Sequence, residues 1–140
     1  MNIETIKNGI VIDHIVAGKG MEVYNFLNLA ELDCTVALIK NVPSEKTGKK
    51  DIIKIDADIP INFDVIGYVD PEATVNIIKN GELVEKRPIS MPERLVNVIK
   101  CKNPRCITSI EQELPHVFKL TDKESGTYRC IYCDSRAKKF

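Results

Sequence analysis

The sequence contains no tryptophan, and aromatic residues make up only 6% of its 140 residues. Its core must therefore be built mainly from aliphatic side chains. No apolar run approaches the roughly 20 residues needed to cross a bilayer, so we expect no membrane association. The amino-terminal segment also has no cationic lead followed by an apolar stretch and a cleavage site, which predicts a cytoplasmic protein.

The formal net charge of the chain is zero at pH 7, because twenty Lys and Arg residues balance twenty Asp and Glu residues. Such a chain has no general attraction for a polyanion. Residues 101–140 hold eight basic and five acidic residues, a formal excess of only three positive charges. The sequence therefore predicts no nucleic-acid partner and no phosphate-binding stripe in this segment.

The familiar motifs of catalysis do not occur: there is no GxSxG elbow, Walker loop or GxGxxG. Asp13 and His14 are adjacent, but successive side chains of a strand point to opposite faces. The two therefore converge only at a strand end or a bulge. Composition alone favours a structural role for His14, and we expect the chain not to be an enzyme.

What the sequence does contain is two cysteine pairs near its carboxyl end, Cys101 with Cys106 and Cys130 with Cys133, separated by twenty-three residues. Two short loops that each present a cysteine pair can supply the four corners of a tetrahedral zinc site. Four thiolates leave no position for water, so we predict one structural Zn²⁺ per chain. Two alternatives are disulfides, which a reducing compartment disfavours, and a redox role for Cys130 and Cys133.

The amino-terminal part predicts alternating strands and helices. Residues 6–15 are rich in β-branched side chains, as in a buried strand. Val23, Phe26, Leu27 and Ala30 have the spacing of one helix face. Residues 35–42 and 51–56 are predicted to be two strands of a hairpin, joined by a turn-forming loop over Pro43–Lys50.

Further along, residues 60–69 are ambiguous between a short helix and irregular structure. Asn80-Gly81 predicts a type I′ turn in a second hairpin. This order predicts an α+β fold: a ferredoxin-like domain with helices on one face of an antiparallel-rich sheet, then a small zinc-ribbon or rubredoxin-like β domain. Pro88 and Pro92 indicate a boundary, giving domains 1–90 and 91–140.

Lys54 and Lys86 stand out because each lies in an otherwise apolar or mixed strand segment. A lysine in such a strand faces either solvent or a ligand. The pattern leaves solvation of a sheet edge and an anion-binding site equally open.

Several runs, in this order, closely resemble the regulatory chain of aspartate carbamoyltransferase. They are GIVIDHI at residues 9–15, GKKDIIKI at 48–55, ATVN at 73–76 and PER at 92–94, followed by the cysteine spacing. The resemblance covers nearly the whole chain. It implies a non-catalytic subunit with a nucleotide-binding domain at 1–90 and a zinc domain at 91–140 that contacts the catalytic chain. Such chains dimerise and bind CTP or ATP, and UTP in some cases, as effectors.

The resemblance also implies roles for single residues. Asp13 would hold the ribose hydroxyls, His14 and Lys86 would meet the triphosphate, and Lys54 would bridge base and ribose. The residues that would frame the base are Ile6, through its backbone, Val11, Asn76, Ile78 and Leu83. The loops around Asn103 and Asp134 would contact the catalytic chain. Gly81 and Arg105 depart from the family's pattern, which has an aromatic and a neutral amide at these places.

An alternative interpretation is a zinc-ribbon adaptor that binds nucleic acid. It would need a basic surface that carries aromatic side chains beside the ribbon. Its support in the sequence is limited to Lys138-Lys139-Phe140, Tyr128 and Tyr132.

Overall fold

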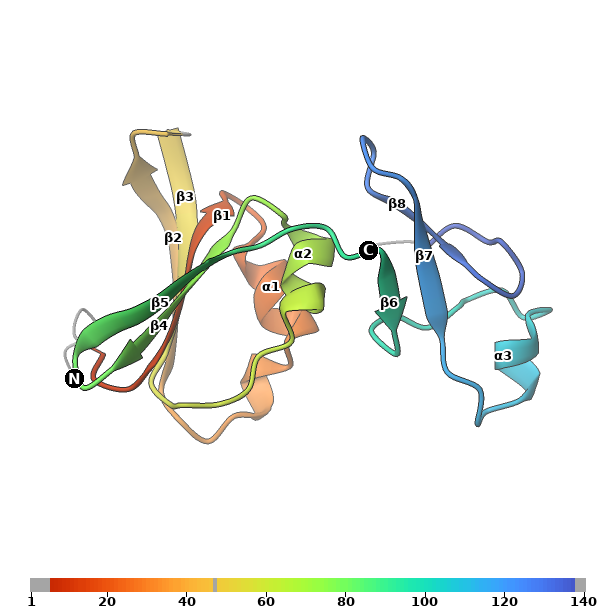
Figure 1. The fold of residues 1–140 in the computed structure, drawn as a ribbon, viewed down its shortest axis with the longest axis horizontal. Helices are drawn as coiled ribbons and strands as arrows, with labels where there is room; N and C mark the ends of the chain where they lie inside the picture. Colours follow the sequence, from red (N-terminus) through yellow and green to blue (C-terminus); the bar gives the residue numbers. More distant parts are fainter. Residues whose placement is uncertain (1–5, 47, 138–140) are drawn as a thin grey trace. The chain divides into compact units, whose positions relative to one another are not determined.

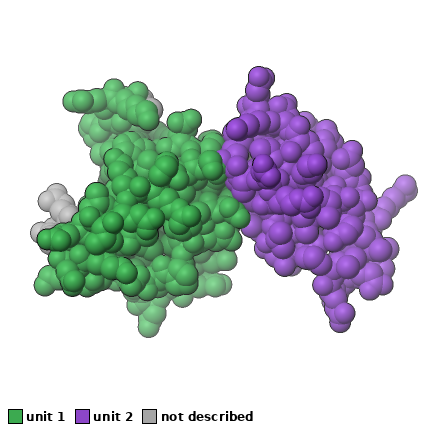
Figure 2. Space-filling model, in the orientation of Figure 1, with its two compact units in different colours: residues 1–90 green, residues 91–140 purple. Residues whose placement is uncertain are grey.

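The computed structural model describes residues 6–46 and 48–137. The chain divides into two compact units, residues 1–90 and residues 91–140 (Figure 2). Residues 138–140, which would support a nucleic-acid adaptor, lie outside the described part. Within that part, no helix has the length and apolar character needed to span a membrane.

The first unit is a five-stranded antiparallel sheet with the strand order β2-β3-β1-β4-β5. Figure 1 shows its two α-helices on one side of the sheet. The prediction of an α+β fold with helices on one face is therefore confirmed. The elements are β1 (Gly9–Val16), α1 (Gly20–Phe26), the 3-10 helix η1 (Leu29–Glu31), β2 (Val36–Ser44), β3 (Gly48–Ile55), α2 (Phe63–Val69), β4 (Thr74–Lys79) and β5 (Glu82–Pro88).

Alternation along the strands sorts apolar from polar side chains. Ile12 pairs with Ile53 on one side and Val75 on the other, and all three are fully buried. Val23 from α1 and Ile66 from α2 complete this aliphatic core. The neighbouring residues of the same strands point to the opposite, open face of the sheet.

The helix pattern that included Ala30 is wrong in its last turn. Helix α1 ends at Phe26, and Asn28 takes a left-handed conformation with φ of 55°. Asparagine tolerates this conformation better than most residues. The chain therefore turns, so that Leu29 is buried while Ala30 is exposed.

The predicted loop over Pro43–Lys50 is also wrong, because both strands continue into it and Ser44 pairs with Gly48. Pro43 is tolerated because β2 is an edge strand. The ambiguous segment contains α2, capped where Asn62 Oδ1 accepts from the Asp64 amide at 3.0 Å. The Asn80-Gly81 turn is confirmed, with φ values of 53° and 78°.

The second unit is a three-stranded antiparallel sheet with the order β6-β7-β8. Its core is small and consists mainly of Leu95, Phe118 and Tyr128, each no more than 1% exposed. The Tyr128 hydroxyl donates to the Pro92 carbonyl at 2.6 Å, which fastens the start of the unit to its last strand. The elements are β6 (Arg94–Val96), α3 (Ile107–Ile110), β7 (Val117–Asp122) and β8 (Thr127–Cys130).

One buried carboxylate holds three parts of the first unit together. Asp51 on β3 is fully buried and accepts hydrogen bonds from the amides of Gly18, Gly20 and Asn41, at 3.0–3.1 Å. Gly18 lies in the turn before α1, Gly20 is the first residue of that helix, and Asn41 lies in the bulge of β2. A Cβ atom on Gly20 would lie 2.7 Å from the carboxylate, so the turn needs glycine there.

We predict that Asp51→Ala lowers the free energy of unfolding by roughly 3–5 kcal/mol. One buried and two part-buried amides would lose their acceptor, and a buried donor without an acceptor costs about 1–3 kcal/mol. Urea unfolding of the full chain, followed by circular dichroism, measures the change. Asp58→Ala removes an exposed carboxylate and should shift stability by less than about 0.5 kcal/mol. Equal effects of the two substitutions would contradict the role given to Asp51.

Candidate functional site

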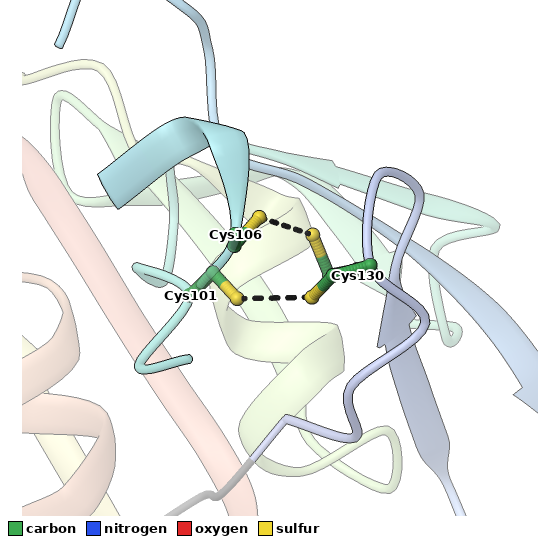
Figure 3. A group of neighbouring side chains, drawn as sticks. Cys101, Cys106 and Cys130 are labelled. Carbon is green, nitrogen blue, oxygen red and sulfur yellow. Dashed lines mark hydrogen bonds between the residues drawn. The ribbon is translucent and has the colours of Figure 1, made fainter. Parts of the chain in front are cut away.

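Four cysteine sulfurs meet at one end of the second unit. Cys101 lies in the loop after β6, Cys106 caps α3, Cys130 ends β8 and Cys133 lies in the turn that follows. Figure 3 shows Cys101, Cys106 and Cys130 pointing toward one another. The four Sγ atoms all lie within 4.8 Å of each other, and Cys101, Cys106 and Cys130 are buried.

The spacing of these sulfurs fits a metal ion. The Sγ atoms of Cys101 and Cys133 are 3.5 Å apart, and those of Cys106 and Cys130 are 3.7 Å apart. A tetrahedral ion with Zn–S bonds of about 2.3 Å would place its sulfurs about 3.8 Å apart. A disulfide requires about 2.05 Å, and all four cysteines are free thiols. The cluster is thus able to hold a metal ion.

Hydrogen bonds shape the two loops that carry the sulfurs. The Asn103 carbonyl accepts from the Cys106 amide at 3.0 Å and from the Ser109 hydroxyl at 2.7 Å. In the other loop, Asp134 takes a φ of 65° while the Cys130 amide donates to the Ser135 carbonyl at 2.9 Å. The Asn103 side-chain amide donates to the Ser135 hydroxyl at 3.3 Å, so the loops are joined directly.

Without a metal, the thiols differ in acidity. Burial raises the pKa of Cys101 to about 12. Burial also acts to raise the pKa of Cys133, but hydrogen bonds from Ser135 and Asn103 outweigh it and lower that pKa to about 6. The metal-free cluster therefore favours a thiolate at Cys133 beside a protonated thiol at Cys101. A bound cation would stabilise the thiolate form of all four cysteines.

His116 supports the first loop, a role that its sequence position did not suggest. Its Nδ1 atom accepts from the Cys101 amide at 3.1 Å, and its own amide donates to the Asn97 side chain at 2.9 Å. The histidine is not part of the sulfur cluster. It fixes the backbone of Cys101. The residues next to His116 in the sequence, including Pro115, do not indicate this contact.

In the first unit, the strand register brings the sequence-predicted nucleotide residues to the open face. Val11 pairs with Lys54 on one side and with Asn76 on the other, and Asn76 pairs with Lys86. These four side chains therefore form one row across four strands. Ile78 and Leu83 pair in a neighbouring row of the same face.

Two features mark this face as unusual. The Oδ1 atom of Asn76 is buried and has no hydrogen-bond partner within the described residues. Ile6 is 8% exposed and covers Gly9, where an added Cβ would lie 2.7 Å from the Ile6 side chain. The Ile6 segment is held there by the hairpin turn, because the Gly81 amide donates to the Lys7 carbonyl at 2.9 Å.

Asp13 and His14 occupy a bulge between Ile12 and Ile15, inside β1 and not at its end. His14 has a φ of 57°, and its Nδ1 atom lies 3.0 Å from the Thr74 hydroxyl. Lys50 forms an ion pair of 3.0 Å with Asp13. Burial acts to raise the pKa of Asp13, but hydrogen bonds from Lys50 and from the His14 amide lower it overall. Sequence reasoning missed both Lys50 and Thr74.

Comparison with known proteins identifies the family. Residues 1–90 match the allosteric domain of the aspartate carbamoyltransferase regulatory chain, and residues 93–139 match its metal binding domain. The chain belongs to the aspartate carbamoyltransferase regulatory chains. Regulatory chains from Clostridium botulinum and Clostridium tetani are each 53% identical to it, over 96% of this chain and 92% and 94% of theirs. That of Bifidobacterium longum is 44% identical over 99% of both chains.

This family membership confirms the resemblance on which the residue roles were based. The aspartate carbamoyltransferase regulatory chain described here is a non-catalytic subunit with an allosteric and a metal-binding domain. The four-cysteine cluster lies within the residues that match the metal-binding domain.

We predict that the second unit depends on its metal, since a small core gains about 10 kcal/mol or more from such a site. A strong chelator, or Cys106→Ser, should collapse the NMR amide dispersion of residues 91–140 while residues 1–90 keep theirs. Cys34→Ser removes a cysteine outside the cluster and serves as the control. Retention of the dispersion of residues 91–140 in metal-free protein would contradict this prediction.

Proposed function

We propose that this chain binds CTP and ATP on the open face of its first sheet and transmits their effect to an aspartate carbamoyltransferase catalytic chain. The observation that carries the proposal is the row of Lys54, Val11, Asn76 and Lys86. A buried amide oxygen without a partner in the described chain is an acceptor suited to a base amino group. Lys86, which pairs with Asn76, offers positive charge to the phosphates, and Lys54 lies at the other end of the row.

The neighbouring residues suit the remaining parts of a nucleotide. Asp13 would accept from the ribose hydroxyls, and its lowered pKa keeps it ionised. His14 and Lys86 would meet the triphosphate, and Lys54 would reach base and ribose. Val11, Ile78 and Leu83 supply an apolar surface for the base, and the backbone at Ile6 borders it. UTP shares the same phosphates and ribose and is a further effector under this proposal.

We assign zinc to the cysteine cluster. Four thiolates at tetrahedral spacing favour Zn²⁺ and leave no open position, so the ion would be structural. The ligands would be Cys101, Cys106, Cys130 and Cys133. The loops that this ion stabilises contain Asn103 and Asp134, which we propose as contacts to the catalytic chain. The assembly would work in the cytoplasm, where thiols stay reduced.

We further propose that two copies dimerise through the edge strand β2. The two edges of the sheet differ: β5 carries Glu82, Glu85 and Lys86 and ends at Pro88, which discourages pairing. Strand β2 instead presents the half-buried apolar run Val36–Ile39. An isologous pairing of two such edges would give a twofold symmetric dimer.

Regulation then follows from linkage between sites. CTP and ATP would compete for one face but favour different arrangements of the dimer, and the zinc domain would pass that bias to the catalytic chain. Linkage requires that ligands of the catalytic chain change nucleotide affinity by the same factor, typically worth about 1–3 kcal/mol.

Lys86→Ala should weaken CTP binding roughly tenfold or more, because a charge-assisted hydrogen bond to phosphate is worth about 1.5–3 kcal/mol. Calorimetric titration of the metal-loaded full chain measures this affinity. Lys79→Ala provides a matched control, because Lys79 belongs to the same hairpin but points to the other face. Unchanged CTP affinity in Lys86→Ala, with metal content intact, would refute the site.

For the dimer, Ile39→Lys should raise the dissociation constant about tenfold or more, since like charges brought together at an interface cost several kcal/mol. Sedimentation equilibrium of the full chain gives the constant. Val84→Lys places the same charge on β5, where Val84 is 55% exposed, and should leave the dimer unaffected. The reverse result would assign the interface to β5.

A further inference from the structure

Four cations lie in one row across the second unit. Arg94 on β6 pairs with Lys119 on β7, Lys119 pairs with Arg129 on β8, and Arg129 bridges to Arg136 in the segment after β8. Paired residues of antiparallel strands point to the same face. Each of these four backbone segments therefore contributes one positive charge to the same side of the sheet. We call Arg94, Lys119, Arg129 and Arg136 the basic row.

The basic row faces away from the small core. The adjacent pairs are Leu95 with Phe118 and Phe118 with Cys130, and all three residues are buried. Because strand side chains alternate, the row must lie on the opposite face. Arg94, Lys119 and Arg136 are exposed, and Arg129 is half-buried.

The charges of the row are not neutralised within the described chain, where no carboxylate lies within 4.0 Å of any of the four. Arg129 instead donates to the Asp134 carbonyl at 3.1 Å, which orients its guanidinium. Like charges placed directly opposite each other destabilise a sheet. Such an arrangement is better suited to receiving an anionic partner than to stabilising the free chain.

We propose that the basic row docks an acidic helix of a partner protein, with a stripe of carboxylates across the strands. Neighbouring strands are about 4.8 Å apart, so four cations span about 14 Å. Along one face of an α-helix, side chains recur about every 5.4 Å, which is close to the spacing of about 4.8 Å between neighbouring cations of the row. A shallow groove of about 510 Å³ borders the row, lined by Glu93, Arg94, Lys119, Leu120, Thr121 and Lys123.

A nucleic acid fits this face less well. Binding of single strands uses aromatic side chains as stacking platforms beside the cations. Here Phe118 and Tyr128, the aromatic residues of β7 and β8, are both 1% exposed and belong to the core face. A row of cations without aromatic side chains favours carboxylates on a regular helix.

The test uses a synthetic helical peptide with Glu at i, i+4, i+7 and i+11, and a second peptide with the same residues distributed around the helix. Each is titrated into the metal-loaded, isotope-labelled full chain and followed by NMR. We expect the striped peptide to bind better, to shift amides of β6, β7 and β8, and to weaken with salt. Lys119→Ala and Arg129→Ala should each weaken it roughly two- to fivefold, as for exposed ion pairs.

Lys100→Ala is the matched control, because it removes an exposed cation of the same unit outside the row, and it should leave binding unchanged. Lys119→Ala should not lower the melting temperature at low salt, which separates lost binding from lost folding. The proposal is overturned by absent binding, by equal binding of the two peptides or by an equal effect of Lys100→Ala. Tighter binding of a single-stranded oligonucleotide to the same residues would also overturn it.

Discussion

The register between β1 and its two neighbours, β3 and β4, is the constraint on which the first unit depends. It buries Ile12 between Ile53 and Val75 and, one residue away, aligns Val11 with Lys54 and Asn76. A slip by one residue would exchange the two faces and bury the polar set. The same strand register therefore determines both the aliphatic core and the proposed nucleotide face. Burial of the core sets the geometry of the open face.

The second unit applies the same alternation with far less apolar material. Leu95, Phe118 and Tyr128 occupy one face of a three-stranded sheet, and the basic row occupies the other. A core of this size stabilises little on its own. A metal ion in the cysteine cluster would add the missing stability, because the cysteines lie at the end of β8 and in the loops that Asn103 and Ser135 join. The proposed partner surface would thus depend on a metal ion that takes no part in catalysis.

Much of this organisation could be predicted from the sequence because its signals are local. Each cysteine pair, the Asn80-Gly81 turn and each single strand or helix can be recognised within a short segment. What failed depended on distant contacts: Pro43 fits a strand only because β2 is an edge, and Asp51 has a role only where three remote amides converge. The residues of the basic row are spread from Arg94 to Arg136, so the net charge of the segment does not reveal them. Only the pairing of the strands brings them onto one face.

The bulge at Asp13 and His14 shows how such distant contacts shape the open face. A left-handed residue other than glycine costs roughly 1–2 kcal/mol, so His14 needs support. Asp13 accepts from the His14 amide at 2.6 Å, and Thr74 contacts its ring. Beyond the bulge, the buried Asp70 accepts from the Val16 amide at 2.7 Å, and Asp51 holds the turn that follows. Two carboxylates that face the core therefore fix the position of two residues proposed to face the nucleotide, and the site's geometry is set from behind the sheet.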